Sequence, residues 1–236
     1  MLQLRQRVRR TACLVAATAL AAAACTSDDE DLPAAGTLLD AAADSAGEVT
    51  SAHFALQATG DVPGLTVQMV EGDLTTDGGP YGAAQGVATV SMGGQLVESE
   101  FVLHEESLYL KGPTGGFQEI PADRVTSIYD PSAVLDPERG VAHLLDQVRE
   151  AETTGTDTVD GTETHRVTGT VEHQVIDELI PGVESDAEIT LWLDEERDHL
   201  PVKVTLSFPE AGGDETPTVD VTLSEVNEPV TVSPPE

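Results

Sequence analysis

The sequence is poor in cysteine and in aromatic residues, and each shortage excludes a class of protein. Its two cysteines are Cys13 and Cys25, so no disulfide can join the later parts of the chain and the fold must rest on an apolar core. Aromatic residues make up 3% of the chain. This is too little for the stacking surface that recognition of carbohydrates or nucleobases normally needs. What remains for recognition is apolar area.

Basic residues are also scarce. The chain has 11 Lys and Arg, four of them within the first ten positions, against 43 Asp and Glu, and its formal net charge is −32. Such a polyanion cannot neutralise phosphates, so nucleic acid is excluded as a partner. An anionic bilayer would repel it unless a covalent anchor held it there. The same charge is also typical of a solvated surface adapted to a salty medium.

Catalytic motifs are missing as well. The sequence contains no G-x-S-x-G, H-x-x-x-H, C-x-x-C or Ser-x-x-Lys pattern, and no glycine pattern of a nucleotide site. The acid pairs Glu105-Glu106 and Glu195-Glu196 fall at expected hairpin turns, where solvated charge is ordinary. The six histidines are scattered along the chain: His53, His104, His143, His165, His173 and His199. We therefore predict no catalytic residue, no metal and no cofactor, and a protein that is not an enzyme.

The N-terminus has the pattern of an export signal. Residues 1–24 combine a basic start, an apolar stretch and small residues, and the stretch is too short to span a membrane permanently. Cys25 follows at the position where lipoproteins carry an acylated cysteine, so we predict a lipid anchor there and a location on the outer side of the cell membrane. Ala22 stands where lipoboxes usually have Leu, which leaves cleavage by ordinary signal peptidase as the alternative. Residues 25–36 are expected to form a flexible acidic tether.

The remainder, residues 37–236, is expected to form one domain. Its periodicity predicts helices at 37–47, 121–128, from 136 to about 148 and from 170 to 180, and strands at 49–59, 65–76, three runs within 86–111, 164–169, 189–193, 202–208 and 219–223. This order is typical of an α+β fold, in which helices gather on one face of a strongly curved antiparallel sheet. Such a sheet leaves room for an apolar cavity.

Residues 86–111 alternate apolar and polar residues in three short runs, and we expect this strand meander to be the centre of the sheet. Its apolar positions are small or flexible, so they either form a lean core or line an apolar hollow. The predicted pocket wall consists of Ala88, Val90, Met92, Val97, Phe101 and Leu103, with Val67 and Met69 from the preceding strand.

Several short segments of the sequence resemble the LppX/LprA/LprF/LprG family of actinobacterial envelope lipoproteins. They are SAHFALQATGDVPGL from Ser51, GDLTT from Gly72, MGG from Met92, FVL followed by LY, SIYDPSAVLDPERGVAHLL from Ser127, WL at Trp192 and HLPVKV from His199. They occur in a consistent order between about Leu38 and Pro229, and the LprG-like members are the most similar.

This resemblance implies a half-barrel of antiparallel strands packed against helices, similar to bacterial lipoprotein carriers, with an apolar cavity for acyl chains. It implies a triacylated glycolipid or triacylglycerol as cargo, and an efflux-type membrane transporter as a partner. The strongly acidic surface favours a cargo that is neutral or whose headgroup stays outside. Two alternatives remain: a scaffold of the envelope without a ligand, and an envelope hydrolase.

Overall fold

The computed structural model describes residues 32–112, 115–125, 134–136, 138, 140–209 and 215–235. All of them belong to one compact unit, Leu32–Glu236. Within these residues no helix is both long and apolar enough to cross a membrane. The strands are β1 Ser51–Thr59, β2 Val67–Thr75, β3 Ala83–Met92, β4 Gln95–His104, β5 Ser107–Lys111, β6 Phe117–Pro121, β7 Arg149–Val159, β8 Thr162–Val171, β9 Ala187–Asp194, β10 Pro201–Ser207 and β11 Thr218–Ser224. The helices are α1 Ala35–Gly47, α2 Ala122–Val125, α3 Val141–Asp146 and α4 His173–Leu179.

The strands form one open sheet in the order β6-β5-β4-β3-β2-β1-β11-β10-β9-β8-β7, and every neighbouring pair is antiparallel. This confirms the predicted α+β class with a mostly antiparallel sheet. The expectation that residues 86–111 form its centre is wrong. These residues do form the meander of β3, β4 and β5, but the strand in the middle of the order is β1, which pairs with both β2 and β11. The free edges are β6 and β7.

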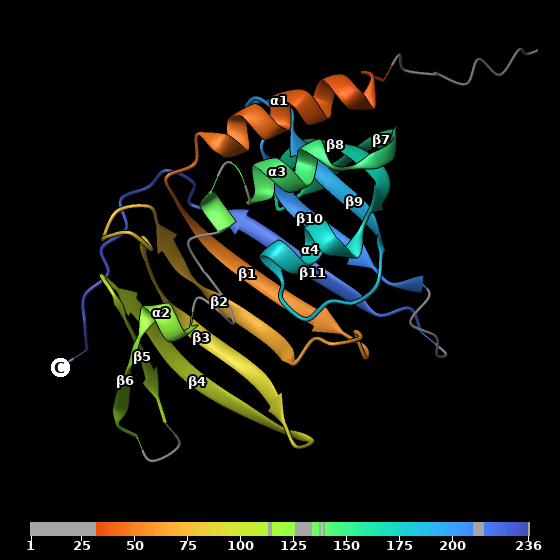
Figure 1. The fold of residues 1–236 in the computed structure, drawn as a ribbon. Coiled ribbons are helices and arrows are strands. Elements are labelled where there is room, and N and C mark those ends of the chain that lie inside the picture. The colour runs from red at the N-terminus through yellow and green to blue at the C-terminus, as the bar shows by residue number, and fades with distance from the viewer. Residues whose placement is uncertain are drawn as a thin grey trace, which may run out of the picture. The chain divides into compact units, whose positions relative to one another are not determined.

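The helices lie on one face of the sheet, which we call the inner face (Figure 1). Cross-strand register identifies its residues, because side chains directly opposite each other point to the same side. One such row runs Phe54–Gly72–Gly86–Phe101–Leu110. The alternating positions, among them His53, Asp73, Gln85 and Trp192, form the polar outer face. The sheet thus separates an apolar side from a charged one.

The densest part of the core lies between the helices and the inner face of β8–β11. Leu38 and Ala42 of α1 and Ile176 of α4 are at most 1% exposed. On the sheet, Val167 and Leu191 are fully buried. The apolar stripe of α1 explains why this helix forms, although its start differs from the prediction. It begins at Ala35, two residues before the predicted start at 37, and its N-cap is Ala34 without a side-chain hydrogen bond.

Two other helices begin later in the chain than predicted. The helix expected from Asp136 begins at Val141, with Gly140 as its N-cap, while the Asp136 side chain accepts a hydrogen bond from the Glu138 N–H and forms a turn. The helix expected to be capped by Thr170 begins at His173, because Thr170 continues β8 and pairs with β7 and β9. The chain around 149–159, which we did not predict as a strand, is the edge strand β7.

Candidate functional site

The predicted pocket-wall residues gather on the inner face, with one exception. Val90 lies opposite Val97, and Phe101 lies opposite Gly86. The same face carries the predicted wall residues Ala88, Met92, Leu103 and Val67. Three strands that follow one another in the chain therefore bring seven of the eight residues to one surface.

Met69 is the exception, because it lies on the outer face. It is opposite Gln57 on β1 and Thr89 on β3, whereas Val67 is opposite Val90. The register shifts between Val67 and Met69, so an extra residue interrupts the alternation of β2. The prediction assumed that two residues two positions apart share a face, and this irregularity breaks that rule. Met69 does not belong to the inner surface.

Exposure of the inner face rises along β3 and β4 toward their connecting turn. Ala84 and Leu103, at the end near α2, are 1% and 2% exposed. Val90 and Val97 are half-buried, and Met92 beside the turn is 63% exposed. The inner face of β2–β4 is thus closed at one end and open at the other.

A pair of glycines forms the middle of this surface. Gly72 and Gly86 lie opposite each other between the rings of Phe54 and Phe101. Neither glycine has a side chain, so the floor between the two rings is bare backbone. In the next row Ala88 is the smallest member, flanked by Val70 and Ser99. The result is a surface with apolar rims and a low centre, a shape that suits a narrow apolar chain.

The prediction missed several members of this surface. Phe54, Val70 and Leu110 lie in the same rows as the predicted residues. Each has the right alternation within its own strand, but only the cross-strand register shows that the strands share a face. That register was not visible in the sequence.

The two halves of the inner face differ in packing. On β8–β11 many inner-face apolar side chains are 0–2% exposed, as at Val167, Leu191 and Leu206, although Val204, Val221 and Leu223 are half-buried. On β2–β5 the inner-face side chains toward the β3–β4 turn are half-buried, as at Val70, Val90 and Leu110, whereas those at the other end, such as Leu74 and Leu103, are buried. Helices α1, α3 and α4 lie over the first half (Figure 1). The half-buried part of β2–β5 is therefore the place where the fold offers apolar area to a ligand.

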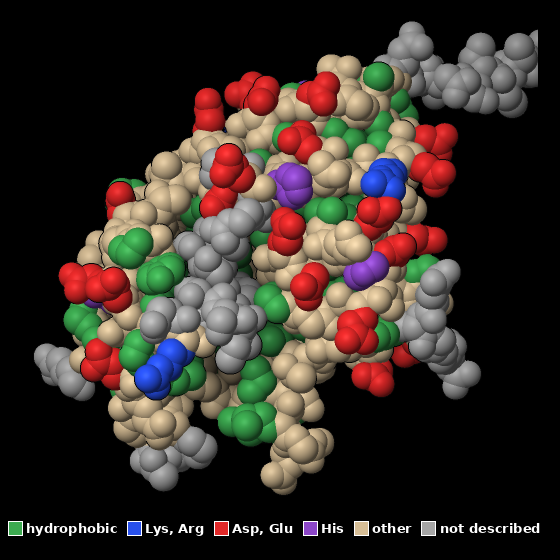
Figure 2. Space-filling view, viewed as in Figure 1, with side chains coloured by type: hydrophobic (Ala, Val, Ile, Leu, Met, Phe, Trp, Pro, Cys, Tyr) green, Lys and Arg blue, Asp and Glu red, His purple; other side chains and the backbone are tan. Residues whose placement is uncertain are grey.

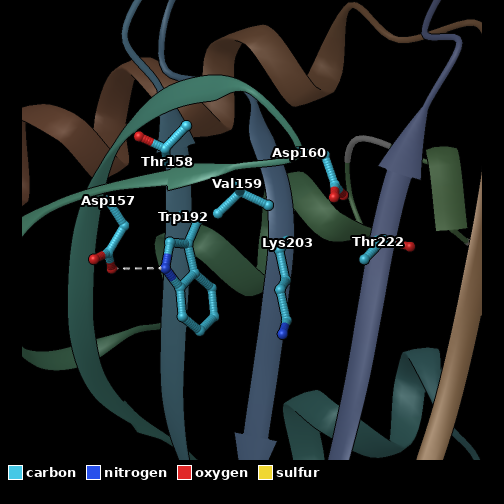
Figure 3. Close-up of a pocket in the computed structure, with 7 residues that line it drawn as sticks. All are labelled: Asp157, Thr158, Val159, Asp160, Trp192, Lys203 and Thr222. Atoms are coloured by element: carbon cyan, nitrogen blue, oxygen red, sulfur yellow. Dashed lines mark hydrogen bonds between the residues drawn. The ribbon is translucent and has the colours of Figure 1, made fainter.

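Two depressions lie on the other side of the sheet. One, of about 440 Å³, is lined by β7 and the outer face of β9–β11 (Figure 3). There the Trp192 indole N–H donates to Asp157 over 3.0 Å, and the Lys203 ammonium lies 5.0 Å from the indole ring and 3.4 Å from Asp220. These polar groups already have partners, so they show no vacancy for a ligand.

The second depression, of about 510 Å³, lies on the outer face of β1–β4. His53 Nδ1 is 2.7 Å from Asp73 and its Nε2 is 3.7 Å from Glu71, so the polar groups are again paired with one another. The enclosed apolar cavity that we predicted is not among these depressions.

No metal-binding group of side chains is found among the described residues. They contain no group of three or more His, Cys, Asp or Glu that could hold a metal ion. The most buried carboxylate, Asp194, has a structural role at the end of β9. Burial alone would raise the pKa of Asp194, but hydrogen bonds from Arg197 Nε at 2.6 Å and from the Glu196 N–H at 2.8 Å outweigh it, so the pKa lies below 3.8.

A model of the family described as LppX_LprAFG lipoprotein matches residues 34–232. This chain belongs to the LppX_LprAFG family. The match spans every described helix and strand, and it agrees with the resemblance that the individual segments of the sequence show to this family. The family is one of lipoproteins, and its LprG relatives are named carriers, which agrees with the prediction that this member is not an enzyme.

Comparison with individual relatives gives the same placement. The chain is 37% identical to the lipoarabinomannan carrier protein LprG of Mycolicibacterium hassiacum over 97% of this chain and 99% of that one. It is 33% identical to LprG of Mycobacteroides abscessus over 98% and 99%. The crystal structure of LprF from Mycobacterium bovis superposes with a TM-score of 0.72 at 25% identity, covering 85% of this chain and 96% of that one. LppX of Mycobacterium tuberculosis has the same fold, with a TM-score of 0.61 at 22% identity over 84% and 98%.

Two predicted features of this LppX_LprAFG member fall outside the described residues. Cys25 and the tether up to Asp31 are among them, so the acyl anchor stays a prediction. Much of the longest family segment, which starts at Ser127, also lies outside the described residues, because residues 126–133, 137 and 139 are not described.

Proposed function

We propose that the protein is an exported lipid carrier that holds acyl chains against the inner face of β1–β5. The observation that supports this most is the gradient of exposure on that face: Ala84 and Leu103 are buried at one end, whereas Val90 and Val97 are half-buried and Met92 is 63% exposed toward the β3–β4 turn. Removing a methylene from water contributes about 0.8 kcal/mol, so a long acyl chain on this surface would be bound tightly.

The proposed cargo is a triacylated glycolipid or triacylglycerol. The LprG relatives are named lipoarabinomannan carriers, which supports a lipid that bears a glycan. The formal net charge of −32 disfavours an anionic headgroup near the protein surface, and it tolerates a neutral lipid or a headgroup that stays outside. The bare glycine floor and Ala88 leave space for acyl chains, and no charged side chain lies in the rows around them.

Acylation of Cys25 would hold the carrier at the outer side of the cell membrane, since an anchor overcomes the repulsion between an acidic protein and an anionic bilayer. An efflux-type membrane transporter is the proposed partner that supplies or receives the lipid.

Native mass spectrometry of the protein purified from a lipid-producing actinobacterial host tests this proposal. We expect the protein to carry a bound acyl lipid, whereas the same protein after delipidation should regain one from mixed vesicles. Recovery without lipid, under conditions in which an LprG relative retains one, would contradict a carrier function and favour a scaffold of the envelope. Ester hydrolysis that a single Ser, Asp or His substitution abolishes would favour a hydrolase instead.

A further inference from the structure

The hairpin of β3 and β4 ends in an apolar tip, which we define as Met92, Gly93, Gly94, Gln95 and Leu96. We propose that this tip inserts into the surface of a lipid bilayer and places the open end of the inner face against the membrane. The inference rests on the proposed carrier function, because it names the surface at which the lipid enters or leaves.

Exposed large apolar side chains are concentrated at this end of the sheet. Four are found among the described residues, and three of them lie on β2–β4: Met69 at 39%, Met92 at 63% and Leu96 at 68%. Met92 and Leu96 flank the two-glycine turn, and Met69 lies opposite Thr89, three residues before Met92 on β3. Isolated apolar residues are common on surfaces, but a group of three at one end of three neighbouring strands marks an interaction site.

The tip is also free of charge in a strongly acidic protein. Residues 78–97 contain no Asp, Glu, Lys, Arg or His, although the chain has 43 acidic residues. In Figure 2 acidic side chains cover much of the visible surface, but none is visible at the lower end of the view, where this hairpin projects (Figure 1). This segment is therefore a part of the protein that an anionic lipid surface would repel least.

The distribution over the two sides of the hairpin favours a bilayer over a protein partner. Met92 belongs to the inner face and Leu96 to the outer face, since Met92 is opposite Gln95 and Leu96 is opposite Ser91. A protein interface would usually cover one face of the hairpin, whereas insertion into lipid surrounds both. The turn between them adds no bulk, because Gly93 and Gly94 have φ angles of 60° and 81° and lack side chains.

The inner side of the tip continues the proposed lipid surface. Met92 follows Val90 and Ala88 along the same side of β3, with exposure rising toward the tip. An acyl chain that slides along this side would leave the protein at Met92 without crossing a charged residue. Insertion of the tip would therefore let the lipid pass between bilayer and protein while its apolar part stays out of water.

The test uses the full chain reconstituted in phosphatidylcholine vesicles, with an environment-sensitive fluorophore on a cysteine at the tip. Leu96→Cys carries the label, and quencher groups are placed on the lipid acyl chains. Because interfacial apolar groups lie ~5–10 Å below the headgroup boundary, we expect the tip label to lose at least about half of its emission. Adding Met92→Ser to the labelled chain should weaken this quenching several-fold, since it removes the second apolar side chain of the tip.

The matched control is Thr158→Cys, an exposed position beside the β7–β8 turn, which should show no such quenching. The unsubstituted chain, labelled in parallel, gives the background from Cys13 and Cys25. Equal quenching at positions 96 and 158, or none at position 96, would overturn the proposal, as would quenching that needs a membrane protein in the vesicles. Lipid content by native mass spectrometry is measured on the same samples. If the tip inserts but no lipid is bound, the carrier function fails and tip insertion does not.

Discussion

Gly72 and Gly86 face each other across β2 and β3 so closely that a β-carbon added to either would lie 2.1 Å from a carbonyl oxygen of the opposite strand. The oxygens concerned belong to Gln85 and Glu71. No flexible side chain can move aside to relieve such a contact, because the obstructing atoms are backbone. The two strands therefore require glycine at both positions.

We expect Gly86→Ala to destabilise the protein by about 1–3 kcal/mol, the usual cost of overpacking, because the two strands must separate. Chemical denaturation measures the free energy of unfolding. Gly36→Ala is the control, since a β-carbon there meets nothing within 4 Å and alanine favours the helix. An unchanged stability of Gly86→Ala would show that the two strands separate easily.

Ala88→Trp tests the proposed lipid surface. The indole would occupy the low centre of the inner face, so we expect loss of copurified lipid with little change in melting temperature. Thr89→Trp, the next residue on the same strand, places the ring on the outer face and should leave lipid binding intact. Retained lipid together with a destabilisation of ~1–3 kcal/mol would instead place Ala88 in ordinary, densely packed core.

Leu191→Ala and Leu110→Ala make the same chemical change on the two halves of the inner face. Leu191 is fully buried, so its truncation should cost about 2–5 kcal/mol of unfolding free energy. Leu110 is half-buried, and we expect a clearly smaller cost in the lipid-free protein together with weaker lipid binding. Equal costs, measured by denaturation after delipidation, would mean that both halves are packed alike.

Asp194→Asn should reduce stability at neutral pH by about 1–3 kcal/mol, because Arg197 and the Glu196 N–H lose a charged acceptor. The pKa of Asp194 is lowered in the folded state. Its contribution is therefore fully present above the pKa of the unfolded chain, near 3.9, and is lost as the pH falls through the folded pKa. Melting temperatures between pH 7 and pH 2 should show a smaller acid-induced decrease for the variant than for the parent. Parallel curves would contradict this role.

Much of the fold could be predicted because apolar alternation marks most strands clearly. β3, β4 and β5 form the expected meander, the β9 and β11 ranges contain the predicted runs, and β10 contains all of the run 202–208 except Phe208. β7 escaped prediction because it is an edge strand rich in Thr and acidic residues, with at most half-buried positions and two register shifts. A strand with no buried face gives no alternation of apolar residues to detect.

Helix starts were less predictable than helix existence. Asp136 and Thr170 have side chains that commonly cap helices, but one forms a local turn and the other continues a strand. The candidate site depended on a second unknown, the register between strands. The register places Val67 opposite Val90, as expected for two wall residues, but it places Met69 on the outer face.

The pairing of β1 with β11 has a consequence for the order in which the protein assembles. Within the series β1–β6, and likewise within β7–β11, every pair joins strands that are adjacent in the sequence. Either series can therefore form from local segments. The junction between them joins Leu56 to Val221, near opposite ends of the chain. Closing such a distant contact is slow and needs the last strand to be present. A nascent or truncated chain would thus have two unjoined half-sheets, and maturation of the whole carrier must await its C-terminus.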